Sequence, residues 1–108
     1  MKFFNIVLVF LTLNFYNATW ADWKSDYTYM PSEGYVPDAK TAKLIAEAIW
    51  IPIYSEKQIE SEKPFKAVLK NDIWIVEGTY HSKAYFGGTA YIRISKKDGR
   101  ILQCLHSM

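Results

Sequence analysis

Apolar positions in the first half of the chain recur with a helical period. After Pro37 they lie three or four residues apart, and charged residues fill the positions between them, which is typical of an amphipathic helix that rests one face on a core. Asp38 is the expected N-cap, and Pro52 should kink or end the helix near Trp50 to Tyr54. The predicted core-facing positions are Ala42, Ile45, Ile49 and Ile53.

Beyond Pro64 the period becomes an alternation of apolar and polar residues, which indicates strands. Residues 55–64, polar and charged around Ile59, are interpreted as a solvated connection. The sequence therefore predicts an α+β domain in which one main N-terminal helix packs on a four-stranded antiparallel meander sheet. The predicted strands are Phe65 to Lys70, Ile73 to Thr79, Gly88 to Ser95 and Arg100 to His106.

Two turns determine the expected register of this sheet. A two-residue loop at Asn71 and Asp72 places Lys70 opposite Ile73 and, at the far end of the pair, Lys66 opposite Glu77. A three-residue loop over 97–99, with Gly99 in the left-handed conformation, places Ile94 opposite Leu102 and Ile92 opposite Cys104.

The register divides the strand residues between two faces of different character. The inner face, which should pack on the helix, collects Phe65, Ala67, Leu69, Trp74, Val76, Ala90, Ile92, Ile94, Leu102 and Cys104. The outer face collects Lys66, Val68, Lys70, Ile73, Ile75, Glu77, Tyr91, Arg93, Ile101, Gln103 and Leu105. A solvent-facing sheet surface is usually polar, so this mixture of apolar and charged residues indicates a surface for a partner. The predicted partner-binding residues are Ile73, Ile75, Glu77, Tyr91, Arg93 and Gln103.

The N-terminal segment, residues 1–21, reads as an export signal. Lys2 is followed by an apolar run and then by Thr19-Trp20-Ala21, which offers small residues at the positions that signal peptidase inspects. Cleavage after Ala21 predicts a periplasmic protein without a stable membrane anchor. An uncleaved anchor is the alternative. Residues 22–37 are aperiodic and are expected to form an extended arm, so the folded domain is predicted over 38–108.

Charge and residue content exclude several classes of function. The 13 Lys and Arg residues nearly balance the 11 Asp and Glu residues and are interspersed with them, which argues against a nucleic-acid partner. His81 and His106 lie far apart without ligands at suitable spacing, so neither a metal nor a cofactor is expected. Cys104 is the single cysteine and cannot form an intramolecular disulfide.

Catalytic residues are also not expected. Ser82, His81 and Asp98 form a triad only on paper, because no nucleophile motif surrounds them. Glu77 invites interpretation as a general base, but an ion pair with Lys66 or Arg93 on the sheet is the favoured reading. The chain is therefore predicted not to be an enzyme.

Residues 35–108 resemble a family of bacterial immunity proteins with a nuclear transport factor 2-like, or cystatin-like, fold, the YbbC/YhhH family. The matching segments are 42–47 (AKLIAE), 62–64 (EKP), 74–78 (WIVEG), 87–92 (GGTAYI), 94–99 (ISKKDG) and 105–107 (LHS). The resemblance implies a partner toxin of the polymorphic or Rhs class, protection of the producing cell by binding that toxin, and no catalytic residues.

Three hypotheses follow. The first is an inhibitor that binds a cognate toxin through the outer face, with the arm over 22–37 as a clamp. The second is a small-ligand-binding or hydrolytic domain with a pocket between helix and sheet, although the inner face offers only apolar residues and Cys104. The third is a homodimer that buries the same outer face.

Overall fold

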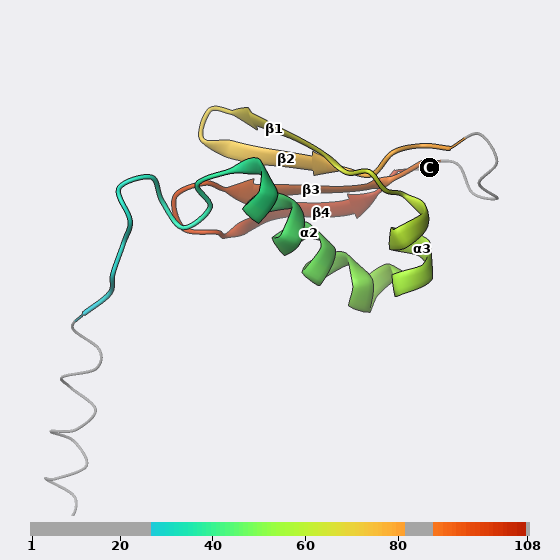
Figure 1. The fold of residues 1–108 in the computed structure, drawn as a ribbon, viewed down its shortest axis with the longest axis horizontal. Coiled ribbons are helices and arrows are strands. Elements are labelled where there is room, and N and C mark those ends of the chain that lie inside the picture. Colours follow the sequence, from blue (N-terminus) through green and yellow to red (C-terminus); the bar gives the residue numbers. More distant parts are fainter. Residues whose placement is uncertain (1–26, 82–87, 108) are drawn as a thin grey trace, which may run out of the picture. The chain divides into compact units, whose positions relative to one another are not determined.

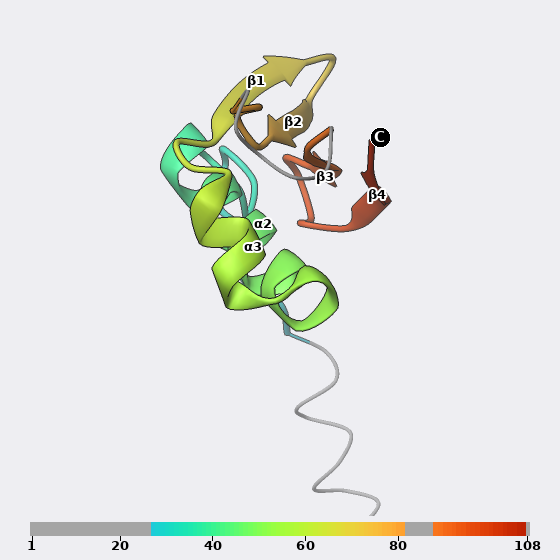
Figure 2. The ribbon, with the colours of Figure 1, turned by 90° about the vertical axis from the view of Figure 1, so that its right-hand side faces the viewer.

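A computed structural model describes residues 27–81 and 88–107 of the chain. The chain divides into two units, Met1–Met30 and Pro31–Met108, and the fold belongs to the second. In that unit two helices cover one face of a four-stranded antiparallel sheet (Figure 1; Figure 2). The predicted α+β architecture is thus confirmed, whereas the predicted export signal lies outside the described residues.

Helix α2, Ala39–Tyr54, begins and ends where the sequence predicts. The carboxylate of Asp38 accepts hydrogen bonds from the hydroxyl and the backbone N–H of Thr41, at 2.7 and 2.8 Å. These two hydrogen bonds lower the pKa of Asp38. Pro52 lies inside the last turn, and the helix ends two residues later.

The buried stripe of α2 is displaced from the predicted one. Ala42, Ala46 and Trp50, each four residues apart, are fully buried. Ile45 and Ile49 flank this stripe and are partly buried, as predicted. Ile53, a predicted core-facing position, is instead 58% exposed, because the last turn of the helix diverges from the sheet (Figure 1). The small side chains at the first two stripe positions let the helix approach the strands closely.

Helix α3, Glu56–Ser61, replaces the connection that was predicted over 55–64. Ser55 ends α2 with a φ of 81° and begins α3, because its Oγ accepts from the backbone N–H of Gln58 at 3.2 Å. Ile59 is 1% exposed and anchors the helix to the core. One apolar side chain and one cap thus produce a turn of helix in a segment that otherwise looks solvated.

Strands β1 (Lys66–Lys70), β2 (Ile73–Glu77), β3 (Ala90–Ser95) and β4 (Ile101–His106) form the sheet in the order β1-β2-β3-β4. The predicted meander is therefore correct.

The β1–β2 loop is the predicted two-residue turn. Asn71 and Asp72 both have positive φ, 52° and 60°, which fits a type I′ hairpin. Lys70 accordingly pairs with Ile73, and the predicted register of this hairpin holds along its whole length.

The β3–β4 turn is one residue longer than predicted. Gly99 has the expected positive φ of 76°. Its N–H donates to the carbonyl of Ser95, and the N–H of Ser95 donates to the carbonyl of Arg100, both at 2.9 Å. Ser95 therefore faces Arg100, and the loop between them spans residues 96–99.

A bulge in β4 compensates for the longer turn. Ile94 pairs with Ile101 rather than with Leu102, and the register shifts between Arg93 and Ile94. Because this bulge absorbs the extra residue, Ile92 still pairs with Cys104, as predicted.

The bulge corrects the predicted faces of two residues, and the sheet edge leaves a third, inner-face residue more exposed than expected. Ile101, assigned to the outer face, packs against the core, and Leu102, assigned to the inner face, is 37% exposed. Leu69 lies on the edge strand β1 and is 43% exposed. Ala67 and Cys104 are partly buried, as expected of the inner face. The buried core consists of Val36, Ala42, Ala46, Trp50, Ile59, Phe65, Trp74, Val76, Ala90, Ile92 and Ile94.

The segment before α2 is part of the packed domain. Val36 is fully buried, its N–H donates to the carbonyl of Lys96 at 3.0 Å, and its carbonyl accepts from Trp74 Nε1 at 2.8 Å. Gly34 has a φ of 83°, and a Cβ there would come within 2.5 Å of the Lys96 carbonyl oxygen. The C-terminal end of the predicted arm thus docks against the β3–β4 turn.

Candidate functional site

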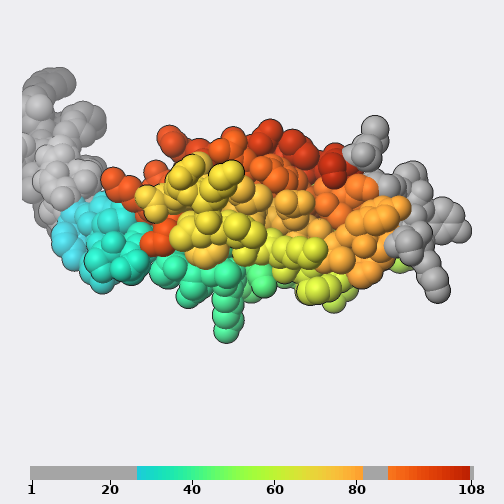
Figure 3. Space-filling model, turned by 90° about the horizontal axis from the view of Figure 1, so that it is seen from above, coloured from blue at the N-terminus to red at the C-terminus, as the bar shows by residue number. Residues whose placement is uncertain are grey.

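The six predicted partner-binding residues share the sheet face that points away from the helices. Alternate positions such as Trp74 and Ile92 are buried on the side of the sheet that α2 contacts, so the residues between them face outward. Seen from above, residues of all four strands form a continuous surface beside α2 (Figure 3). The register arranges the six in three rows: Ile73 with Ser95, Ile75 with Arg93 and Gln103, and Glu77 with Tyr91.

We define the outer face by these rows and by Lys66, Val68, Lys70 and Leu105, which the register places at their ends. It is rich in apolar surface: Val68 is 60% exposed and Leu105 37%, while Ile73, Ile75 and Tyr91 are half-buried. Neither described helix covers it. Binding of a partner by these residues stays a prediction.

The ion pair predicted for Glu77 is not formed. Lys66 lies directly opposite Glu77 in the register, yet within the described part of the chain no salt bridge includes Glu77. An exposed pair contributes only about 0 to 1 kcal/mol, because water screens it and both side chains lose freedom. Lys66 and Glu77 therefore gain little by pairing and can remain separately hydrated on this face.

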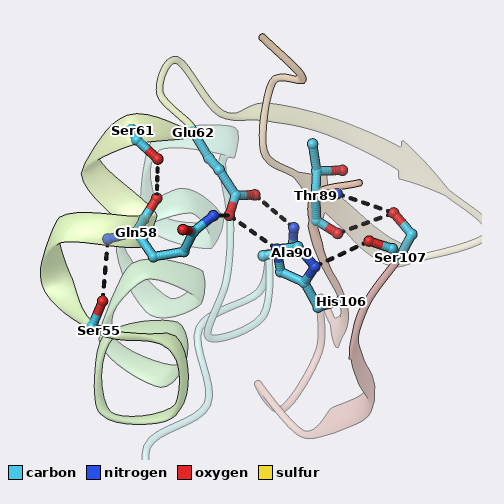
Figure 4. A network of polar contacts seen from close by, with 8 residues as sticks. All are labelled: Ser55, Gln58, Ser61, Glu62, Thr89, Ala90, His106 and Ser107. Atoms are coloured by element: carbon cyan, nitrogen blue, oxygen red, sulfur yellow. Dashed lines mark hydrogen bonds and ion pairs between the residues drawn. The ribbon is translucent and has the colours of Figure 1, made fainter. Parts of the chain in front are cut away.

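A buried carboxylate lies at the other end of the domain, in a segment that sequence reasoning interpreted as solvated. Glu62 follows α3 directly and is 4% exposed. Its Oε1 accepts from the N–H of Ala90 at 2.7 Å. Its Oε2 accepts from Gln58 Nε2 at 3.0 Å and lies 3.1 Å from His106 Nε2 (Figure 4). Both oxygens are thus used within the domain.

The backbone around Glu62 is shaped to receive it. The carbonyl of Glu62 accepts from the N–H of Thr79 at 2.7 Å. A Cβ at Gly78 would lie 2.5 Å from Glu62 Oε1, so a larger residue there would displace the carboxylate. Glu62, Gly78, Ala90 and His106 all lie in the segments that carry the family resemblance, and this shared membership is the sequence signal that could have marked the site.

His106 extends the network to the C-terminal end of the sheet. Its Nδ1 lies 3.0 Å from the carbonyl of Ser107, and its ring lies 5.2 Å from that of Tyr54. Burial raises the pKa of Tyr54, and the neighbouring Cys104 raises it further. Ser107 Oγ in turn bonds the backbone of Thr89 (Figure 4). The network therefore joins α3 to the start of β3 and the end of β4.

The structure does not support a catalytic triad of Ser82, His81 and Asp98 in the part of the chain that it describes. His81 Nε2 bonds the carbonyl of Lys63 at 3.0 Å, and Asp98 accepts from the N–H of Arg100 at 3.0 Å within its own turn. Ser82 lies outside the described residues.

In residues 27–81 and 88–107 no group of three or more His, Cys, Asp or Glu side chains could hold a metal ion. No helix within those ranges is both long and apolar enough to cross a membrane.

The comparisons with known proteins agree with this architecture. The profile of the family described as NTF2 fold immunity protein matches residues 41–108. The Escherichia coli (strain K12) protein YhhH, itself uncharacterized, is 36% identical over 113 residues, which cover 96% of this chain and 88% of YhhH. The uncharacterized YbbC of the same strain is 41% identical over 54 residues, which cover 50% of this chain and 44% of YbbC. No solved structure gives a significant match. The family resemblance seen in the sequence is confirmed: the chain belongs to the NTF2 fold immunity protein family.

Proposed function

We propose that this protein binds and neutralises a cognate protein toxin through its outer face, without catalysis. Membership in an immunity family supports a toxin as the partner. The observation that carries the choice of surface is the apolar outer face, which the described helices leave uncovered. Contiguous exposed apolar surface of this kind marks protein interaction sites on soluble domains.

The middle of the outer face has the composition of a binding hot spot. Ile75 and Arg93 pair across the two central strands, and Tyr91 lies two residues along β3 on the same side. Aromatic and arginine side chains near the centre of an interface contribute most of its binding free energy. The strands hold these residues on a rigid frame, so docking requires little ordering of the backbone.

The buried carboxylate supports the absence of catalysis in this proposal. A general base needs an available lone pair within reach of a substrate proton. Glu62 is 4% exposed, and its oxygens point inward to the N–H of Ala90, the amide of Gln58 and the ring of His106, so its carboxylate is not presented to a substrate at the surface. We assign Glu62 a structural role at the junction of α3 with β3 and β4.

The proposed site of action is the periplasm. This part of the proposal rests on the export signal read in residues 1–21 of the sequence. A toxin met there acts on the cell wall or the membrane, or crosses the periplasm towards another target.

The experiment is protection of a bacterial host that expresses a candidate toxin module taken from the genes that flank this one. The full chain should protect, and the double variant Ile75→Glu, Tyr91→Glu should not. Two carboxylates desolvated without partners cost several kcal/mol on docking, which weakens a nanomolar complex by about a thousandfold or more.

The matched control is Leu44→Glu, Ile53→Glu, which also adds two carboxylates. Both positions are on α2 and each is 58% exposed, so this variant should fold and protect like wild type. Circular dichroism and a thermal melt verify folding of each variant. A folded outer-face variant that still protects removes this face as the binding surface. Failure of the wild-type chain to protect rejects the immunity function for that toxin.

A further inference from the structure

Resting on the proposed function, we infer that the toxin docks with an acidic surface and that one of its carboxylates binds the guanidinium of Arg93. Arg93 lies on the central strand β3, between Ile75 and Gln103 in the middle row of the outer face. Its side chain is half-buried, so its aliphatic part is already in the protein surface while its charged end remains accessible.

Arg93 has no carboxylate partner within the described part of the chain. The salt bridges there involve Lys63, Lys96 and His106 as the basic groups. Glu77 is diagonal to Arg93 on the neighbouring strand, but the two do not form an ion pair. The guanidinium is therefore free to bind a carboxylate from outside the chain.

The charges around Arg93 favour an acidic partner. The outer face carries three basic residues, Lys66, Lys70 and Arg93, and one acidic residue, Glu77. The lysines lie on the edge strand β1, at the margin of the face. These two positively charged lysines attract an acidic protein surface as it approaches, and added salt weakens this attraction.

Burial of the centre of the outer face by a partner requires a carboxylate of that partner beside Arg93. A partner that covers Ile75 and Tyr91 also removes water from the guanidinium between them. A buried charge without a counter-ion strongly destabilises a complex. A carboxylate accepts two parallel N–H bonds from an arginine fork and matches its planar geometry, which a lysine does not offer.

A second copy of this chain fits the same face less well. In a two-fold dimer the outer face would meet itself, so each copy would bring three cations against a single carboxylate. Like charges would then remain opposed in the interface. The charge pattern therefore selects an acidic protein surface over self-association.

The test measures, by calorimetry, binding of the purified protein to an inactivated form of the toxin module against which the wild-type chain protects. Arg93→Glu should weaken binding by about 30-fold or more, because a charge pair becomes a repulsion at a desolvated site. Arg93→Lys should recover part of that loss. Glu77→Gln, which removes the one acidic group from the face, should bind as tightly as wild type or more tightly. Reversal of one acidic residue on the toxin to arginine should restore binding to Arg93→Glu.

The outcomes separate this inference from the proposed function. If wild type and Arg93→Glu bind the module within about threefold of each other, the toxin still docks but the assigned carboxylate contact is wrong. If Ile75→Glu, Tyr91→Glu also binds normally, the outer face itself is not the docking surface. A wild-type dimer in light scattering that Arg93→Glu dissociates would overturn the inference in favour of self-association.

Discussion

Removal of the buried carboxylate should be the most damaging single polar substitution in the domain. Glu62→Ala deletes the acceptor of the Ala90 N–H, and Ala90 is fully buried. An unsatisfied buried N–H costs about 1 to 3 kcal/mol. Gln58 and His106 lose a partner too, but both are partly exposed and reach water, so each adds about 0.5 to 1.5 kcal/mol. The expected loss in the free energy of unfolding is about 2 to 6 kcal/mol.

Glu62→Gln is the matched control for this substitution. The amide keeps an oxygen for the Ala90 N–H and nearly the same shape beside Gly78, so the cost should be about 1 kcal/mol. Urea unfolding of the purified protein, followed by tryptophan fluorescence, measures both variants. A domain of this size has little stability to lose, since small domains lie near the low end of 5 to 15 kcal/mol. An alanine variant within about 0.5 kcal/mol of wild type would show that the network does not hold α3 to the sheet.

Two further predictions concern the core and the cap of α2. Trp74→Phe should cost about 1 kcal/mol, because it removes the N–H that bonds the Val36 carbonyl, whereas Trp74→Ala should cost about 3 to 5 kcal/mol; equal urea midpoints for the two would contradict this assignment. Asp38 has a lowered pKa in the folded state, so its stabilisation is present above the unfolded value and is lost as the pH falls through the folded value. Asp38→Asn keeps the cap but cannot titrate, so its melting temperature should fall less than that of wild type between pH 6 and pH 3; parallel curves would contradict the assignment.

Local turn chemistry made much of the sheet predictable. Asn71 and Asp72 tolerate positive φ, and a two-residue loop admits one register, so the pairing of β1 with β2 followed from the sequence. The β3–β4 hairpin was harder. The extra turn residue shifts the register of β4, and the bulge near Leu102 shifts it back. The alternation of apolar and polar residues does not reveal two shifts that compensate each other.

The parts that the sequence did not reveal depend on contacts between distant segments. Glu62 belongs to a charged run, and its burial requires Ala90 and His106, which come 28 and 44 residues later. Val36 lies in an aperiodic stretch, and a hydrogen bond from Trp74 Nε1 to its carbonyl helps to hold it in the core. Neither position has a local period, which is the signal that sequence reasoning uses.

Under the proposed export, the packed unit that begins at Pro31 also bears on when the signal segment would be removed. If cleavage follows Ala21, nine residues separate the cut from Pro31. Fully extended, nine residues span at most about 30 Å. That distance would let a membrane-bound peptidase reach its site while Val36 stays seated in the core. Folding and processing could then proceed in either order, and an uncut chain would hold a finished domain within that reach of the bilayer.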